Sequence, residues 1–196
     1  MDVGKLFDPS QTFETERLII RIITPDDARD YFEIASSPIV SAETIWNRHQ
    51  TQEDTIGYLQ RVLNRFEKKE EIHWGIIYKE TNKLIGRTGL IMIDSEHEKA
   101  ELGYVISNHY WNQGIATEAA YPILEYAFNV VGFNRIEARC RSNNVGSYRV
   151  MEKLGLVFEG ILRKQLKIKG KFMDQKLYSI LKVEFESTFG EDSSIG

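Results

Sequence analysis

One stretch of the chain, residues 101–119, combines a predicted strand, a short loop and a predicted helix in an order that suits anion binding. The loop contains Gly114, and the small residue Ala116 lies in the first turn of the helix. A helix that begins directly after a strand points its unpaired N–H groups, and the positive end of its dipole, at whatever lies beyond the strand. Gly114 and Ala116 let the backbone approach an anion closely. The junction is therefore a candidate site for a phosphate or a pyrophosphate.

Other residue types that do chemistry show no pattern of their own. The four histidines, at positions 49, 73, 97 and 109, have no metal-ligand spacing, so we expect no metal. Cys140, the only cysteine, alternates with charged residues on a predicted strand, which favours a small core residue. A Gly-rich P-loop is absent, which argues against a nucleotide-binding regulator.

The apolar pattern predicts one mixed sheet covered by helices on both faces. Strands are predicted at 17–23, 73–78, 84–93, 100–106, 135–141, 156–168 and 172–183. Helices are predicted at about 25–35, 51–66, 116–131 and 145–154. The second of them begins with a capping box of Thr51 and Asp54, and the fourth ends at Gly155 as a left-handed cap.

Length and composition indicate one independently folding domain. The 196 residues carry 25 Lys and Arg against 29 Asp and Glu, a net charge of −4. We expect a flexible segment at 1–14, one domain at 15–184 and a flexible tail at 185–196. Mild acidity argues against general nucleic-acid binding, and the apolar runs are too short to span a membrane. A single cysteine, with no leader-like start, favours a cytoplasmic protein.

Several motifs together resemble the GNAT family of acetyl-CoA-dependent N-acetyltransferases. The stretch Trp111-Asn-Gln-Gly114-Ile-Ala116 matches the last two positions of the family pattern Gln/Arg-x-x-Gly-x-Gly/Ala, with Trp at the first. Trp111, together with Ala116-Thr-Glu-Ala119, is similar to the sequence of the family branch that acetylates the N-terminal amines of ribosomal proteins. The resemblance covers about 15–183, with further matching stretches at 15–21, 84–89, 140–147 and 151–156.

The resemblance implies an α/β fold of α+β type. Its sheet would be mixed and mostly antiparallel, with six or seven strands splayed into a V between two central strands, and about four helices on its two faces. Acetyl-CoA would lie in the notch as co-substrate, without a metal. Backbone near Tyr104 to Ile106, Val105 and Ile106 above all, would pair with the pantetheine arm, and Asn143 would lie beside that arm or the thioester. The N–H groups that would hold the pyrophosphate are those of Asn112, Gln113, Gly114, Ile115, Ala116 and Thr117.

Acetyl transfer to an amine requires a neutral nucleophile, and an α-amine with a pKa of about 8 is only about one-tenth neutral at pH 7. A carboxylate that removes the proton, through water, would therefore assist. Glu101, on the central strand beside the notch, is the candidate base, with Glu118 and Glu159 as rivals. The alternative for Glu101 is a solvated or ion-paired strand residue.

The usual acid of the family, a Tyr, is replaced by Met151, which cannot donate a proton. Ser147, one helical turn earlier, matches a serine of the N-terminal-acetylating branch and would hydrogen-bond the leaving thiolate. The alternative is a serine that only caps the helix. Trp46 and His49 lie in the loop where this family forms its acceptor site, and core packing is their alternative role.

The resemblance implies an N-acetyltransferase that moves an acetyl group from acetyl-CoA to a primary amine by direct attack. The N-terminal α-amine of a ribosomal protein is the best match by branch. A small-molecule amine, such as a polyamine, an amino acid or an antibiotic, is the alternative acceptor, and a non-catalytic acyl-CoA-binding module is a second alternative. The sequence does not determine the acceptor or the oligomeric state, for which a homodimer is one option.

Overall fold

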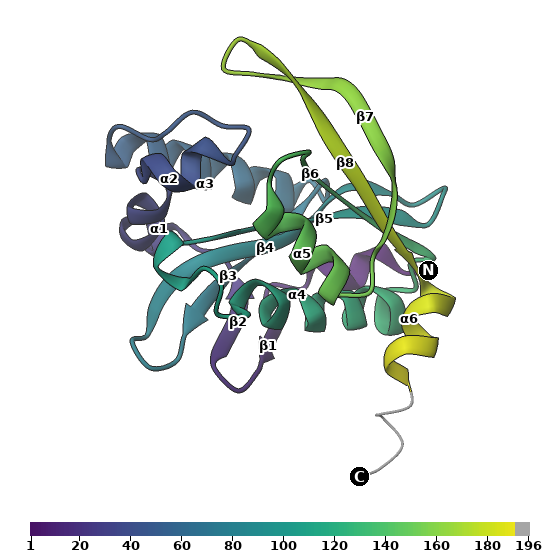
Figure 1. Cartoon of the computed structure of the whole chain (residues 1–196). Coiled ribbons are helices and arrows are strands. Elements are labelled where there is room, and N and C mark those ends of the chain that lie inside the picture. Colours follow the sequence, from purple (N-terminus) through teal and green to yellow (C-terminus); the bar gives the residue numbers. More distant parts are fainter. Residues whose placement is uncertain (191–196) are drawn as a thin grey trace.

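A single eight-stranded sheet runs through the part of the chain that the computed structural model describes, residues 1–190. The strand order is β1-β2-β3-β4-β5-β6-β8-β7, and every neighbouring pair is antiparallel except β5 and β6. The strands are β1 Thr12–Glu14, β2 Leu18–Ile22, β3 Ile72–Tyr78, β4 Lys83–Asp94, β5 Lys99–Ile106, β6 Arg135–Arg141, β7 Val157–Ile168 and β8 Lys171–Leu181. Strands β7 and β8 form a long hairpin whose turn projects beyond the sheet (Figure 1).

Helices cover both faces of this sheet (Figure 1). One face carries α1 (Ala28–Ala35), α2 (Pro38–Ala42) and α3 (Gln52–Glu67). The other carries α4 (Ile115–Tyr126), which continues as the π-helical turn Ala127–Val131, together with α5 (Val145–Lys153) and α6 (Lys182–Phe189). Single 3-10 turns lie at Val3–Phe7, Pro25–Asp27 and Asn108–Tyr110. No helix within the described range is long and apolar enough to cross a lipid bilayer.

The predicted strands and long helices are confirmed to within a few residues, but the expected counts of strands and helices were too low. The eighth strand is β1, which has only three residues and pairs with residues 19–21 of β2. Two of the six α-helices in residues 1–190, α2 and α6, were not predicted. Helix α2 has five residues, too few to show helical periodicity. Helix α6 occupies the start of the expected flexible tail and buries Phe185, whereas residues 191–196 lie outside the described range.

The segment 1–14, expected to be flexible, is folded. Leu6 is completely buried, and the ring of Phe7 lies 5.6 Å from that of Phe66 on α3. The backbone N–H of Asp2 donates to the carbonyl of Val131 at the end of the α4 layer (2.8 Å). An isolated pair of apolar residues has no periodicity, so the sequence contains no pattern that reveals this contact.

The two central strands, β5 and β6, pair over only three residues. Their parallel register is Lys99 with Arg135, Ala100 with Ile136 and Glu101 with Glu137. Beyond this point β5 stays paired with β4, and β6 stays paired with β8. The two strands therefore diverge, and the predicted V-shaped splay of the sheet is confirmed.

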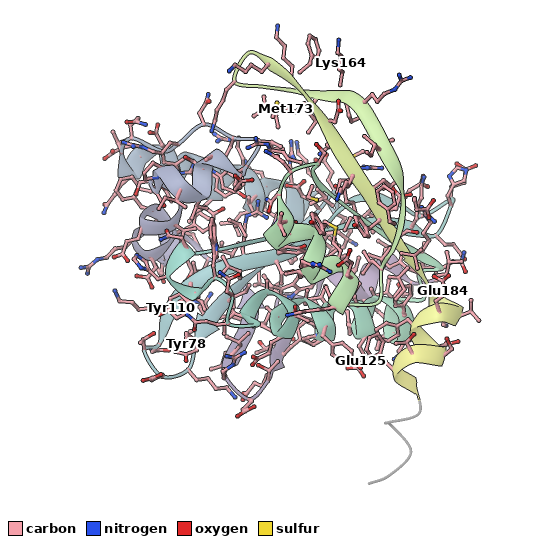
Figure 2. The ribbon with its side chains drawn as sticks, in the orientation of Figure 1. Tyr78, Tyr110, Glu125, Lys164, Met173 and Glu184 are labelled. Atoms are coloured by element: carbon pink, nitrogen blue, oxygen red, sulfur yellow. The ribbon has the colours of Figure 1, made fainter. Side chains whose placement is uncertain are left out.

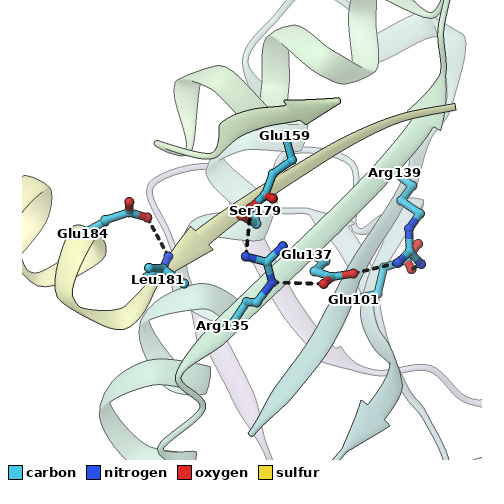
Figure 3. A network of polar contacts seen from close by, with 8 residues as sticks. All are labelled: Glu101, Arg135, Glu137, Arg139, Glu159, Ser179, Leu181 and Glu184. Atoms are coloured by element: carbon cyan, nitrogen blue, oxygen red, sulfur yellow. Dashed lines mark hydrogen bonds and ion pairs between the residues drawn. The ribbon is translucent and has the colours of Figure 1, made fainter. Parts of the chain in front are cut away.

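Ion pairs connect the strands at the vertex of the V (Figure 3). Arg139 on β6 binds both Glu101 on β5 and Glu137 on its own strand. Arg135, also on β6, donates to Glu137 (3.0 Å) and to Glu159 on β7 (2.8 Å). The side chains of Glu101 and Glu137 are each 15% exposed, so solvent screens these attractions less than it screens pairs at the surface.

Replacing Arg139 by Met should destabilise the protein by about 1–3 kcal/mol, because Glu101 and Glu137 lose the cation that they share. Urea unfolding at pH 7 measures the change. The matched control is Arg149→Met on α5, whose ion pair with Glu152 is more exposed and whose loss should cost no more than about 0.5 kcal/mol. Equal losses in the two variants would show that the vertex network adds no stability.

Candidate active site

Unpaired backbone N–H groups gather at the start of α4. Gly114 is its N-cap with φ +78°, and Asn112 has φ +60°, so both adopt the left-handed conformation. Within residues 1–190, no N–H group from 112 to 117 has a hydrogen-bond partner, and the first helical bond runs from Glu118 to the Gly114 carbonyl (3.0 Å). Such a turn followed by a helix N-terminus directs several donors toward one anion.

Aromatic side chains hold the loop that leads into this turn. The ring of Tyr110 packs 5.2 Å from that of Tyr78 at the end of β3, and both are labelled in Figure 2. The indole N–H of Trp111 donates to the carbonyl of Ile106, the last residue of β5 (2.8 Å). The loop is thereby fixed against the end of the strand, which sets the position of Gly114.

Glu118, in the first turn of α4, connects this helix to the residues just before β2 through hydrogen bonds. Its carboxylate accepts hydrogen bonds from the Thr15 hydroxyl (2.6 Å), the Arg17 N–H (3.0 Å) and the Arg17 guanidinium (2.7 Å). Burial opposes the ionised form, but these hydrogen bonds outweigh it and lower the pKa of Glu118. The Arg17 guanidinium lies beside the loop, since a Cβ atom added at Gly114 would be 3.7 Å from it. The sequence did not indicate this cation.

Strand β5 presents to the notch a backbone edge that has no strand partner beyond Glu101, although the Ile106 carbonyl at its end accepts from the Trp111 indole. The carbonyl of Glu98, just before β5, accepts from the N–H of Arg135 at the start of β6 (3.2 Å). Because backbone groups alternate in direction along a strand, those of Tyr104 and Ile106 point the same way, into the gap beyond the vertex. The backbone of Val105, between them, points to β4, and its side chain is buried.

Ser147 lies at the start of α5, where it meets a side chain of β5. Its N–H donates to the side-chain oxygen of the N-cap, Asn144 (3.0 Å), and its Oγ is 3.1 Å from the hydroxyl of Tyr104. That hydroxyl donates to the Ser147 carbonyl (2.7 Å), and burial raises the pKa of Tyr104, so the phenol keeps its proton. The side chain of Tyr104 was missed, although a tyrosine on the buried face of a strand needs a partner for its hydroxyl.

Glu101 and Ser147 lie on opposite sides of the sheet. Side chains alternate along β5, so Tyr104 points to the α4 and α5 face, where Ser147 lies, and Glu101 points to the α1–α3 face. Burial raises the pKa of Glu101, and the charge of Glu137 adds to that rise, whereas Arg139 opposes it. A raised pKa brings a carboxylate closer to what a general base requires.

Three further predicted residues, Asn143, Gln113 and Glu159, differ in their exposure to solvent and in their hydrogen-bond or ion-pair partners. Asn143 is exposed, one residue before the N-cap of α5. Gln113 is exposed, and its side-chain amide donates to the carbonyl of His109 (2.9 Å). Glu159, a rival base, is paired with Arg135 at the vertex, as Figure 3 shows.

Of the two aromatic residues predicted near the acceptor, one is part of the core. His49 is buried, and its Nδ1 lies 2.8 Å from the Thr55 hydroxyl. Burial lowers the pKa of His49, as expected for a packed imidazole. Trp46 is partly exposed on the α1–α3 side, with its ring centre 5.7 Å from the guanidinium carbon of Arg87.

Arg87, a charged residue in the middle of β4 between buried neighbours, was not singled out from the sequence. Its Nε–H donates to the Tyr31 hydroxyl (2.9 Å), and its terminal N–H donates to Nδ1 of His73 (2.7 Å). The ring of Tyr58 lies 5.8 Å away. On its other side, His73 lies 3.2 Å from the carboxylate of Glu71. Burial, and then the charge of Arg87, lower the pKa of His73 to about 4.

Comparisons with known proteins agree on one family. The model of the acetyltransferase (GNAT) domain matches residues 17–157. The chain is 34% identical over 169 residues to "Uncharacterized N-acetyltransferase YoaA" of Bacillus subtilis (strain 168), covering 86% of this chain and 96% of the relative. It is 28% identical over 177 residues to "Putative ribosomal N-acetyltransferase YdaF" of the same organism, covering 87% and 94%. A crystal structure of a GNAT-family acetyltransferase from Bacillus anthracis superimposes with a TM-score of 0.78 at 30% identity, covering 88% of this chain and 99% of that one.

His73 should make stability depend on pH in a defined window. Its pKa is about 4 when folded and about 6.5 when unfolded, so between these values only the unfolded chain takes up the proton. Stability is therefore complete above about pH 6.5, and about 2–3 kcal/mol is lost as the pH falls to about 4. Urea unfolding across this range measures the loss.

The variant His73→Gln keeps an acceptor for Arg87 but does not titrate, so its stability should fall less over the same range. His97→Gln, at an exposed position, is the matched control and should follow the wild type. Parallel curves for the wild type and His73→Gln would contradict the assignment of this proton to His73.

Proposed function

This chain belongs to the GNAT family of acetyltransferases and is an acetyl-CoA-dependent N-acyltransferase, and we propose that its acceptor is the N-terminal α-amine of a protein, most specifically a ribosomal protein. The amine would attack the thioester carbonyl directly, without a covalent enzyme intermediate. A small-molecule amine is the alternative acceptor, and the screen described below separates the two. We also predict that the protein is cytoplasmic, with a homodimer as one option for its oligomeric state.

One observation carries the acetyl-CoA part of the proposal: unpaired N–H groups at the start of α4 lie beside a notch that is edged by β5 backbone without a strand partner. These two features fit the two halves of acetyl-CoA. The N–H groups of residues 112–117 would hold its pyrophosphate, with Arg17 nearby as a cation. The backbone of Tyr104 and the N–H of Ile106 would pair with the amides of the pantetheine arm, which would then lie in the notch as an added strand.

The choice of a ribosomal-protein acceptor rests on two weaker supports. The first is the tryptophan that opens the stretch Trp111-Asn-Gln-Gly114-Ile-Ala116, which resembles the branch that acetylates ribosomal proteins. The second is the similarity to a relative whose name describes a ribosomal N-acetyltransferase. An α-amine also suits a site with a carboxylate base, because about one-tenth of it is neutral at pH 7, against about one part in 2,500 for a lysine amine.

The opposed positions of Glu101 and Ser147 suggest how the reaction is arranged. The amine nitrogen forms a bond to the acetyl carbon, the carbon–sulfur bond breaks, and the nitrogen loses a proton. We assign that proton to Glu101 through water, on the α1–α3 face. On the other face, the hydroxyl of Ser147 would donate to the departing thiolate. Met151, at the position of the usual acid, is buried and has no proton to give.

Glu101→Gln should lower kcat by about 100-fold, and Ser147→Ala by about tenfold, with the affinity for CoA changed less than about threefold. The reason is that both groups act on the reacting atoms and neither contacts the pyrophosphate. Steady-state kinetics and calorimetry with CoA measure the two quantities. Glu125→Gln on α4, labelled in Figure 2, and Ser187→Ala on α6 are matched controls at exposed positions. Equal losses of kcat and of CoA affinity would contradict the assigned roles.

An acceptor screen tests the proposed substrate class. Peptides that copy the N-termini of ribosomal proteins and contain an internal lysine would be incubated with acetyl-CoA, beside a polyamine, free amino acids and an aminoglycoside. Tandem mass spectrometry should find the acetyl group on the α-amine and not on the lysine, because a much larger fraction of the α-amine is neutral at pH 7. The control peptides carry a blocked α-amine. Acetylation of the small amines alone would overturn the protein acceptor.

A further inference from the structure

One cation beside the notch has no anionic partner. The guanidinium of Arg87 donates to the Tyr31 hydroxyl and to the His73 imidazole, and lies near the rings of Trp46 and Tyr58. No carboxylate in the described part of the chain forms an ion pair with it. Every group that contacts this cation directly is therefore an aromatic ring or a neutral hydrogen-bond acceptor.

The neutrality of His73 follows from the direction of its hydrogen bonds. A guanidinium can only donate, so Nδ1 of His73 accepts from Arg87 and Nε2–H donates to Glu71. Glu71 is the acidic group next in line, and it is already paired with Arg65 on α3 (2.8 Å). The imidazole thus lies between Arg87 and the carboxylate of Glu71, which makes no direct contact with the guanidinium.

Such an arrangement is costly to the folded protein unless a ligand completes it. A partly buried charge without a counter-ion loses hydration that neutral partners restore only in part, and the two aromatic rings contribute about 1–2 kcal/mol each at most. Two hydrogen bonds, to the Tyr31 hydroxyl and to Nδ1 of His73, nevertheless fix the orientation of the Arg87 guanidinium. A cation that is kept rigid and left unpaired is suited to receive an anion.

The position of Arg87 connects it to the acceptor side of the proposed reaction. Arg87 pairs across the sheet with Val105 of β5, on the same face as the proposed base, Glu101. Gly103 lies between Val105 and Glu101, and a Cβ atom placed on it would meet no atom within 4 Å. The surface over Gly103 is therefore open, on the face of β5 that also carries the carboxylate proposed to take the proton of the amine.

A second observation points to the same ligand. The indole nitrogen of Trp46, whose ring lies beside Arg87, is buried and has no hydrogen-bond partner. The Nε atoms of Arg139 and Arg141, which bind Glu101 and the Ala42 carbonyl through their terminal nitrogens, are also buried without a hydrogen-bond partner. A carboxylate offers two acceptor oxygens, enough for the guanidinium and the indole together.

We propose that Arg87, with the indole N–H of Trp46, binds a carboxylate that the acceptor carries near its amine. The inference rests on the proposed transfer to an amine and narrows the acceptor to amines that bear an acidic group. Two sources share this chemistry: the α-carboxylate of a free amino acid, and an acidic side chain next to the N-terminus of a peptide. A polyamine is disfavoured, because its second cation would face Arg87.

Two matched pairs of acceptors test the proposal. One is alanine with alaninamide, and the other is the peptide amide Ala-Asp-Ala-Ala with Ala-Asn-Ala-Ala. In one pair the wild type should prefer the acid by at least about tenfold in kcat/KM, because the amide cannot form a charge-assisted bond with Arg87. The pair that shows the preference identifies the source of the carboxylate.

Arg87→Gln should abolish that preference by lowering kcat/KM for the acid, with the amide changed less than about threefold. Arg29→Gln, which removes an exposed cation from α1, is the matched control and should keep it. Because Arg87→Gln can disturb folding, Trp46→Phe serves as a second variant that keeps the ring and removes only the N–H. It should reduce the preference severalfold. Equal rates on acid and amide in both pairs, or variants that slow both members alike, overturn the proposal.

Calorimetry with the same four compounds, on protein saturated with CoA, separates this inference from the proposed function. Tighter binding of an acid that depends on Arg87, without its acetylation, would uphold the carboxylate site and remove the compound as a substrate. Acetylation of the α-amines without any preference for the acid would uphold the proposed function and overturn the carboxylate site.

Discussion

The parallel pairing of β5 with β6 over three residues is the constraint on which the other features of the site depend. A ladder continued along both strands would consume the backbone groups of Tyr104 and Ile106. Because it stops at Glu101 and Glu137, the backbone of Tyr104 and the N–H of Ile106 have no strand partner, and the two strands separate beyond this point. The ion pairs of Arg139 hold the strands together at this last paired position. The opening thus has a stable vertex and an unpaired edge.

The sheet divides the chemistry of the notch between its two faces. Donors and hydroxyl groups lie on the side of α4 and α5, where a thioester and its leaving sulfur would be held. Glu101 and the guanidinium groups of Arg87 and Arg139 lie on the side of α1–α3, where an amine must lose a proton. Keeping the two sets apart prevents Glu101 from forming an ion pair with the groups that would bind phosphate. It also leaves each set free to change without the other.

Much of this was predictable because the signals are local. The helical spacing of the apolar residues of α4, the capping box before α3 and the glycine at position 114 each depend on residues a few positions apart. The contacts of Ser147 with Tyr104 and of Arg87 with His73 join residues 43 and 14 positions apart, and only the tertiary fold creates them. Short segments with only two buried apolar residues, such as η1 (Val3–Phe7), have no period to detect, so their burial was missed.

The place of the first residues affects the order in which the chain can fold. Leu6 and Phe7 leave the ribosome early, but the surface that they cover is built from residues 66 to 131. The vertex likewise joins strands that are separated by the whole of α4. During synthesis Leu6 and Phe7 therefore stay exposed to water until the residues that cover them, up to Val131, have been made. Chaperone contact with nascent chains would fall naturally in that interval.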